Sequence, residues 1–215
     1  MTAGAVDAVA VKICGLCHGA DARAAAAAGA AWAGVILAPG RGRTQTVTQA
    51  AVIFHAVAAS MRRVGVFVDP TAAEVLDAVR LLKLDAVQLH GDEAVGLVKQ
   101  IRAGAGCEVW KAVRVRDPSD VVTGARTWRG RVDALLLDGW SPDAHGGAGA
   151  RFDWAAAAAA GLPGDMRVIA AGGLTPENVA GAISLLRPAI VDVSSGVESV
   201  PGRKSPDRIQ AFVAA

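Results

Sequence analysis

Val9-Ala10-Val11-Lys12-Ile13-Cys14-Gly15 is an apolar, β-prone run that stops at a cysteine and a glycine. Seven further runs of the same kind follow along the chain. The eight runs are Val9–Ile13, Ala33–Leu37, Val64–Val68, Ala86–Leu89, Val109–Val113, Ala134–Leu137, Val168–Ala171 and Ile190–Val193. Short, nearly continuous apolar runs are typical of strands in a parallel sheet that is covered on both faces. The sequence therefore predicts eight parallel strands.

Segments with the apolar spacing of helices alternate with these runs. They are Asp21–Gly29, Thr48–Ser60, Thr71–Leu82, Glu93–Ala103, Pro118–Trp128, Trp154–Gly161, Thr175–Leu186 and Pro206–Val213. Thr71 with Glu74 predicts a capping box, and Thr175-Pro176 predicts the start of the seventh helix. Eight strand–helix units predict an α/β fold, a single (β/α)₈ TIM barrel over residues 1–215. An open doubly wound sheet is the alternative, but strands that end in polar or glycine-rich turns favour closure.

Composition and charge exclude several classes of function. The chain has 215 residues, and its 22 Lys and Arg nearly balance 20 Asp and Glu, which argues against nucleic-acid binding through bulk charge. No apolar run reaches the roughly 18 residues of a membrane span, and no signal peptide is evident. Three cysteines are too few for a disulfide framework. We therefore expect a cytoplasmic protein with no membrane partner.

Glycine-rich turns follow the last two predicted strands. Gly172-Gly173 ends the seventh strand, and Ser194-Ser195-Gly196 ends the eighth. Barrels often bind phosphate with these two loops, because glycines let backbone N–H groups approach an anion. Two ordinary tight turns are the alternative. A third cluster, Gly146-Gly147-Ala148-Gly149, is interpreted as a lid or as a second part of the anion site.

Two reactive side chains stand at other strand ends. Asp138 follows the sixth run, where it is either a loop cap or a buried acid suited to proton donation. Cys14 forms a C-x-x-C pair with Cys17, which leaves open a redox pair, half of a zinc site, an inert residue or a general base. No second ligand pair supports zinc, so we expect no metal. Lys12 lies on the same strand face as Cys14 and would favour its thiolate.

Seven stretches match the motifs of one family in order and spacing. They are Lys12–Gly15, Val64–Val68, Ala86–Glu93, Leu136–Asp138, Gly146–Gly149 with Phe152–Trp154, Ala171–Val179, and Asp192–Glu198 with Pro201-Gly202 and Lys204. Along nearly its whole length the chain resembles phosphoribosylanthranilate isomerase. This resemblance implies a TIM barrel and a cofactor-free aldose–ketose isomerase of tryptophan biosynthesis. Its substrate would be the phosphosugar N-(5-phosphoribosyl)anthranilate, and its product 1-(2-carboxyphenylamino)-1-deoxyribulose 5-phosphate.

The resemblance also implies roles for individual residues. Cys14 matches the general base and Asp138 the general acid. Arg43 matches the arginine that binds the anthranilate carboxylate, although the loop lacks the family's serine and Arg41 is a rival. Asp192 matches a residue near the substrate, or else it bonds the Ser194 loop. A histidine-pathway isomerase and a non-enzymatic phosphate-binding barrel remain alternatives, and the family includes monomers and dimers.

Overall fold

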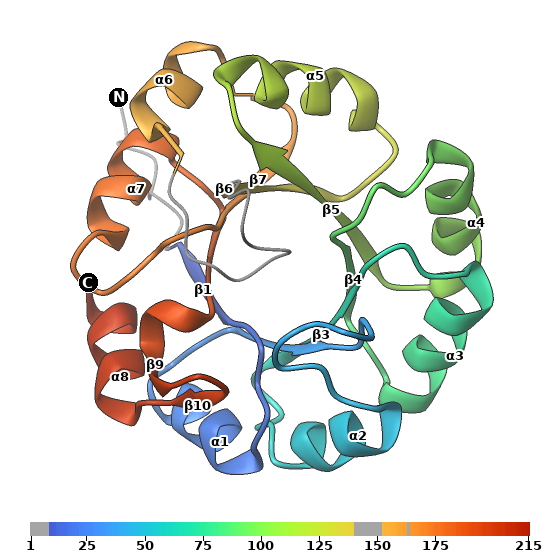
Figure 1. Cartoon of the computed structure of the whole chain (residues 1–215), viewed down its shortest axis with the longest axis vertical. Coiled ribbons are helices and arrows are strands. Elements are labelled where there is room, and N and C mark those ends of the chain that lie inside the picture. The colour runs from blue at the N-terminus through green and yellow to red at the C-terminus, as the bar shows by residue number, and fades with distance from the viewer. Residues whose placement is uncertain (1–8, 140–151, 163) are drawn as a thin grey trace, which may run out of the picture.

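The computed structural model describes residues 9–139, 152–162 and 164–215. In these residues, eight parallel strands close into a barrel in chain order, and helices surround it (Figure 1). The strands are β1 Ala10–Ile13, β2 Trp32–Ile36, β3 Arg62–Phe67, β4 Ala86–Leu89, β5 Glu108–Val115, β6 Ala134–Gly139, β7 Arg167–Ala170 and β8 Ile190–Val193. The barrel closes through the pairing of β1 with β8, which places Lys12 opposite Asp192. The predicted (β/α)₈ barrel is confirmed.

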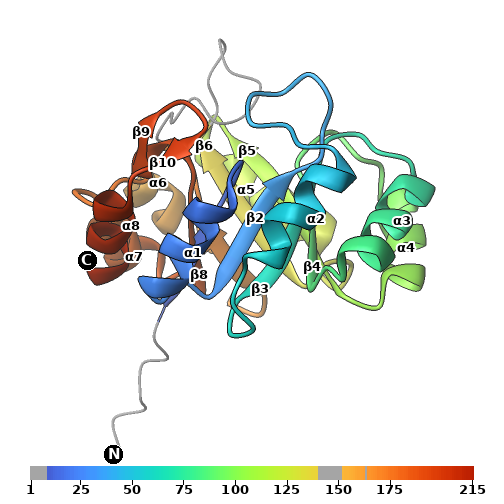
Figure 2. The same cartoon turned by 90° about the horizontal axis from the view of Figure 1, so that it is seen from below.

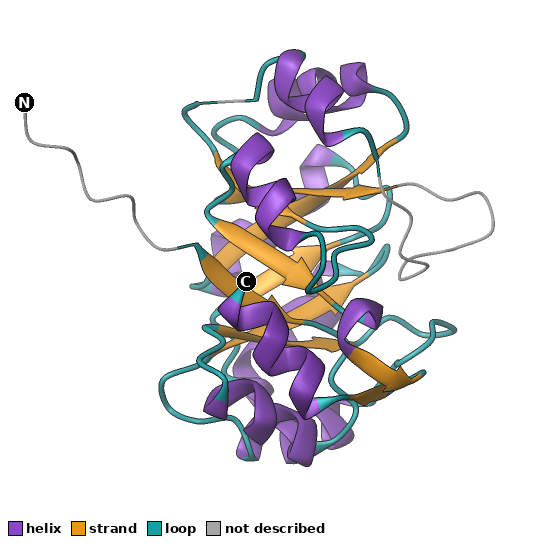
Figure 3. Ribbon diagram, turned by 90° about the vertical axis from the view of Figure 1, so that its left-hand side faces the viewer, coloured by secondary structure: helices purple, strands orange, loops and turns teal. Residues whose placement is uncertain are grey.

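The helices cover the outside of the barrel, as the view from the side shows (Figure 3). They are α1 Gly19–Ala27, α2 Val47–His55, α3 Ala72–Leu82, α4 Val95–Ala105, α5 Pro118–Trp128, α6 Trp154–Ala159, α7 Val179–Leu186 and α8 Pro206–Ala214. The predicted capping box of Thr71 and Glu74 is present at α3. None of the helices in the described residues is long and apolar enough to cross a membrane.

Two predicted helix boundaries differ from the structure by four residues or more. The sequence pattern places the second helix over Thr48–Ser60, but α2 begins one residue earlier and ends at His55. It places the start of the seventh helix at Thr175, but α7 begins at Val179. The backbone N–H of Thr175 donates to Asn178 Oδ1, and Asn178 Nδ2 donates to the carbonyl of Gly173. These side-chain bonds hold the segment as a turn, an arrangement that competes with helix.

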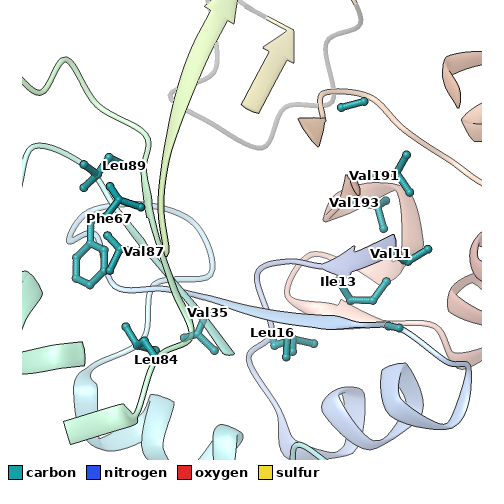
Figure 4. Close-up of a cluster of buried hydrophobic side chains, with 14 of the residues drawn as sticks. Val11, Ile13, Leu16, Val35, Phe67, Leu84, Val87, Leu89, Val191 and Val193 are labelled. Atoms are coloured by element: carbon teal, nitrogen blue, oxygen red, sulfur yellow. The ribbon is translucent and has the colours of Figure 1, made fainter. Parts of the chain in front are cut away.

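Apolar side chains pack on both faces of the strands. Figure 4 shows Val11 and Ile13 of β1 beside Val191 and Val193 of β8, in the large cluster of buried residues. A smaller cluster contains Trp32 and the fully buried Trp110, whose rings meet edge to face with centroids 4.6 Å apart. Because strand residues alternate between faces, the polar Lys12 and Gln88 share the face of this second cluster. They must therefore find polar partners inside the barrel.

The chain after β8 contains structure that the sequence pattern did not predict. A short 3₁₀ helix, Ser195–Val197, is followed by β9, Glu198–Val200, and by β10, Arg203–Lys204. The two strands pair as an antiparallel hairpin before α8 (Figure 2). This hairpin carries Glu198 and Lys204 to the end of the barrel where the strands finish.

Candidate active site

An open pocket with a cavity volume of about 110 Å³ lies where the barrel strands end. All of the predicted site residues that the structure describes line it, namely Cys14, Arg43, Asp138, Gly172, Gly173, Asp192, Ser194, Ser195 and Gly196. Arg41 lines it too. The predicted Gly147 lies outside the described residues.

Cys14 is a buried thiol at the end of β1. Its backbone N–H donates to the carbonyl of Val193, at 2.8 Å, which ties it to the end of β8. Gly34 of β2 makes room for it, since a Cβ there would lie 3.0 Å from both Cys14 Sγ and Lys12 Cε. Burial raises the pKa of Cys14, and the neighbouring Lys12 opposes this without overcoming it. Burial therefore disfavours the expected Cys14 thiolate in the free protein.

Lys12 is fully buried and lies two residues before Cys14, on the same strand face. Its ammonium donates to Asp192 Oδ2 and to Gln88 Oε1, both at 2.9 Å. Burial works against its charge, but Asp192 and Cys14 outweigh burial and raise the pKa of Lys12. Asp192 therefore faces Lys12, and within the described residues its side chain makes no hydrogen bond to the Ser194 loop. Within the described residues Asp192 Oδ1 is buried without a hydrogen-bond partner.

Asp138, near the end of β6, faces the pocket from the other side of the barrel. Its Oδ2 lies 2.9 Å from His90 Nε2, and both side chains are 16% exposed. His90 follows β4, and its Nδ1 lies 2.9 Å from Gln88 Nε2. His90 lies within the stretch Ala86–Glu93 but was not among the predicted site residues. The structure places it in direct contact with the predicted acid.

Arg43 is held by a carboxylate that sequence reasoning did not assign to the site. Its Nε and Nη2 donate to the two oxygens of Glu198, each at 2.6 Å. Lys204 Nζ donates to Glu198 Oε1 at 2.9 Å and to the carbonyl of Ser194 at 3.0 Å. Burial opposes ionisation of Glu198, but its bonds to Arg43 and Lys204 outweigh burial and lower its pKa. Arg43 is thus a fixed cation at the pocket wall.

The loops after β7 and β8 meet at the pocket. Gly172 and Gly173 have φ angles of 80° and 63°, in the left-handed region that favours glycine. Gly196 packs so closely on the carbonyl oxygen of Leu174 that a Cβ would overlap it. The 3₁₀ helix Ser195–Val197 begins in the second loop. Paired loops with a short extra helix are the usual phosphate site of such barrels.

Sequence reasoning missed Gln88, His90 and Glu198 as members of the site. A signal for the first two exists, since Gln88 interrupts an apolar strand and His90 lies two residues further on the same face. Glu198 gives no such signal, because its partner is distant in sequence. Within the described residues, no group of three or more His, Cys, Asp or Glu side chains is placed to hold a metal ion.

A (β/α)₈ barrel with this loop pair, a buried thiol and a carboxylate defines the class of acid–base enzymes that act on small phosphorylated molecules. The family model for N-(5'-phosphoribosyl)anthranilate isomerase matches residues 11–215. The isomerase of Paracoccus denitrificans is 46% identical over 96% of each chain. The chain belongs to the N-(5'-phosphoribosyl)anthranilate isomerase family.

Solved structures agree. The isomerase from Thermotoga maritima superposes with a TM-score of 0.86 at 36% identity, covering 96% of this chain and 97% of that one. Another phosphoribosylanthranilate isomerase, in complex with reduced 1-(o-carboxyphenylamino)-1-deoxyribulose 5-phosphate, has a TM-score of 0.81 at 34% identity, covering 96% and 97%. The Thermotoga maritima protein is described as dimeric.

Proposed function

We propose that this protein is an N-(5'-phosphoribosyl)anthranilate isomerase of tryptophan biosynthesis, an aldose–ketose isomerase that needs no cofactor. It would convert its substrate to 1-(2-carboxyphenylamino)-1-deoxyribulose 5-phosphate by an Amadori rearrangement. Membership of the family supports this activity. The observation that carries it is that Cys14 and Asp138 open into one pocket with the loop pair of Gly172-Gly173 and Ser194–Gly196.

Asp138 is the proposed general acid. The ribose ring opens when its ring oxygen receives a proton, so the acid must enter the reaction protonated. After Asp138 gives up that proton, its carboxylate accepts a hydrogen bond from His90 Nε2 at Oδ2. This bond stabilises the charge that forms on Asp138 as the ring opens, while Oδ1 remains available to the substrate.

Cys14 is the proposed general base. Ring opening leaves a cationic Schiff base, which acidifies the hydrogen on sugar carbon 2. This cation adds to the effect of Lys12 and favours the Cys14 thiolate in a pocket where the pKa of the free thiol is raised. The thiolate removes the proton from carbon 2, and the resulting enolamine tautomerises to the ketone. The net result is isomerisation: Cys14 first releases its own proton to solvent and then takes one from the substrate, while Asp138 gives one proton to the substrate and regains one from solvent.

The remaining predicted residues would bind the two ends of the substrate. Gly172, Gly173, Ser194, Ser195 and Gly196 would hold the phosphate, with Gly147 as a further contact. Arg43 would bind the anthranilate carboxylate. Glu198 occupies its Nε edge, which leaves the Nη1–Nη2 edge for a second carboxylate. Asp192 would face the substrate with its unpaired Oδ1.

The test is turnover of N-(5'-phosphoribosyl)anthranilate, followed by anthranilate fluorescence, in wild type, Cys14→Ser and Asp138→Asn. We expect kcat to fall about 10²- to 10⁴-fold in each variant, the usual contribution of one acid or base. Cys17→Ser is the matched control, because it replaces a nearby cysteine that does not line the pocket. Its Sγ lies against the carbonyls of Gly15 and Arg43 instead. Wild-type rates in both active-site variants would disprove the mechanism.

We also propose that residues 1–215 form one barrel domain, which works in the cytoplasm as a monomer or homodimer without a nucleic-acid partner. The absence of a membrane-crossing helix from the described residues and the biosynthetic activity support this setting. Size-exclusion chromatography with light scattering distinguishes the two oligomeric states, and a larger assembly would contradict both.

A further inference from the structure

A continuous series of hydrogen-bonded side chains crosses the barrel interior from Asp192 to the predicted acid, Asp138. It runs from Asp192 to Lys12, Gln88, His90 and Asp138, and each neighbouring pair of polar atoms is 2.9 Å apart. The links join β8 to β1, β1 to β4, and β4 to β6. Gln88 is its central member and is 1% exposed.

The chemistry of Lys12 determines which groups donate and which accept along this series of hydrogen bonds. An ammonium has three N–H donors and no acceptor, so the side of the Gln88 amide that faces it must be the oxygen. The amide NH₂ group of Gln88 then faces His90 Nδ1 as a donor. A ring nitrogen that accepts a hydrogen bond carries no proton, so the proton of neutral His90 must reside on Nε2. Nε2 is the atom that faces Asp138.

We propose that Gln88 is a positioning residue, which holds His90 neutral and in the Nε2–H tautomer so that it donates to Asp138. The proposal rests on the proposed isomerase function for its catalytic consequence. A doubly protonated imidazolium would bring Nδ1–H against the N–H of Gln88, which is repulsive. An imidazolium would also hold Asp138 as its carboxylate and so remove the acid that opens the ring.

The other charged groups around His90 point the same way. Arg114 of β5 donates from Nη2 to the backbone carbonyl of His90, at 3.2 Å, and its Nη1 lies 3.6 Å from Asp92. This guanidinium adds positive charge near the ring and disfavours a second proton on it. Asp138 is the one carboxylate recorded within ion-pair distance of the His90 ring among the described residues. Gln88 therefore opposes the protonation that Asp138 would otherwise promote.

Gln88→Glu is the sharpest test, because it keeps the shape and replaces the NH₂ donor with an acceptor. The introduced carboxylate can still accept from Lys12 with one oxygen, and its second oxygen now favours a proton on His90 Nδ1. The imidazole ¹⁵N shifts of His90, assigned with His90→Asn, should report neutral Nε2–H in wild type at pH 7 and a protonated Nδ1 in the variant. Gln49→Glu on the exposed start of α2 is the matched control, since a carboxylate can also complete its capping box.

Turnover supplies the second readout. In Gln88→Glu we expect kcat to fall about 10- to 100-fold, with KM within about threefold of wild type. This fall is part of the rate enhancement of about 10²- to 10⁴-fold that general acid catalysis supplies. The loss of kcat in the variant should shrink as the pH rises, whereas Gln49→Glu should match wild type at every pH. A purely structural role for Gln88 would alter unfolding without this pH dependence.

Each negative result has a separate meaning. An Nδ1–H or imidazolium form of His90 in wild type at pH 7, or a wild-type kcat in Gln88→Glu, would overturn the proposal. If wild type did not turn over N-(5'-phosphoribosyl)anthranilate, the proposed function would fail, but the NMR spectra of the protein would still decide the tautomer.

Discussion

Replacing Lys12 with methionine should destabilise the barrel by about 4 kcal/mol at pH 7, and this loss should fade as the pH falls toward 4. Lys12 is fully buried, with its ammonium 2.9 Å from Asp192 Oδ2. At an effective dielectric constant of about 20, two unit charges at that separation attract by about 6 kcal/mol. Methionine fills a similar volume but leaves the Asp192 carboxylate buried without a counter-charge.

Protonation of Asp192 limits the cost. An aspartate in the unfolded chain has an ordinary pKa of about 4, so neutralising it at pH 7 costs about 4 kcal/mol, at 1.36 kcal/mol per pH unit. Because this is less than the lost attraction, the variant should fold with neutral Asp192 and bind a proton on folding. Its stability relative to wild type therefore falls by about 1.4 kcal/mol for each unit of pH above 4. In wild type Lys12 stays charged over this range.

Urea unfolding followed by circular dichroism between pH 4.5 and 7.5 measures the difference. Lys12→Met with Asp192→Asn should lose the pH-dependent part, because no charge remains to be neutralised. Arg102→Met is the surface control: its pair with Asp133 has the same 2.9 Å separation but is 41% and 30% exposed, so it should cost no more than about 1 kcal/mol. A pH-independent difference, or one below about 1 kcal/mol at pH 7, would refute the reasoning.

Three further predictions concern the pocket. Because burial raises the pKa of Cys14 above 9.0, its alkylation by iodoacetamide should be slow at pH 7 and accelerate through pH 9, and a rate that is flat from pH 6 to 9 would contradict a buried thiol. Glu198→Gln should raise KM about tenfold with little change in kcat, because Arg43 loses its bidentate partner, and steady-state kinetics with unchanged KM would exclude this role. Gly196→Ala should weaken inhibition by inorganic phosphate at least about tenfold, since its Cβ would overlap the carbonyl of Leu174, and undiminished inhibition would place phosphate elsewhere.

The barrel could be predicted because its signals are local. Short apolar runs alternating with helical spacing identify the strands and helices, and residues at strand ends are carried to one rim by the topology alone. Cys14, Asp138 and the two glycine-rich turns were therefore found from the sequence. The start of α7 was not found from the sequence, because a hydrogen bond between Thr175 and Asn178 replaces the first helical turn. A proline at this position is equally compatible with a turn and with the start of a helix.

The ionisation of the site depends on contacts that local patterns do not reveal. Spacing indicated that Lys12 would promote the Cys14 thiolate, but it did not show how deeply the thiol is buried, nor that Asp192 shares the ammonium. Desolvation and pairing of charges depend on every neighbour in space, so the pKa of Cys14 follows from the assembled barrel.

By itself, the sequence determined the eightfold strand–helix repeat, the face on which each strand residue lies, and the reactive groups at the strand ends, because these depend on neighbours within a few residues. Only the tertiary structure decided which charged side chains pair with one another. Lys12 meets Asp192 from 180 residues away, and Arg43 meets Glu198 across 155. Barrel closure brings β1 beside β8, and the hairpin after β8 brings Glu198 to Arg43. The physical reason is that charges in a buried pocket act over distances in space, which chain separation does not encode.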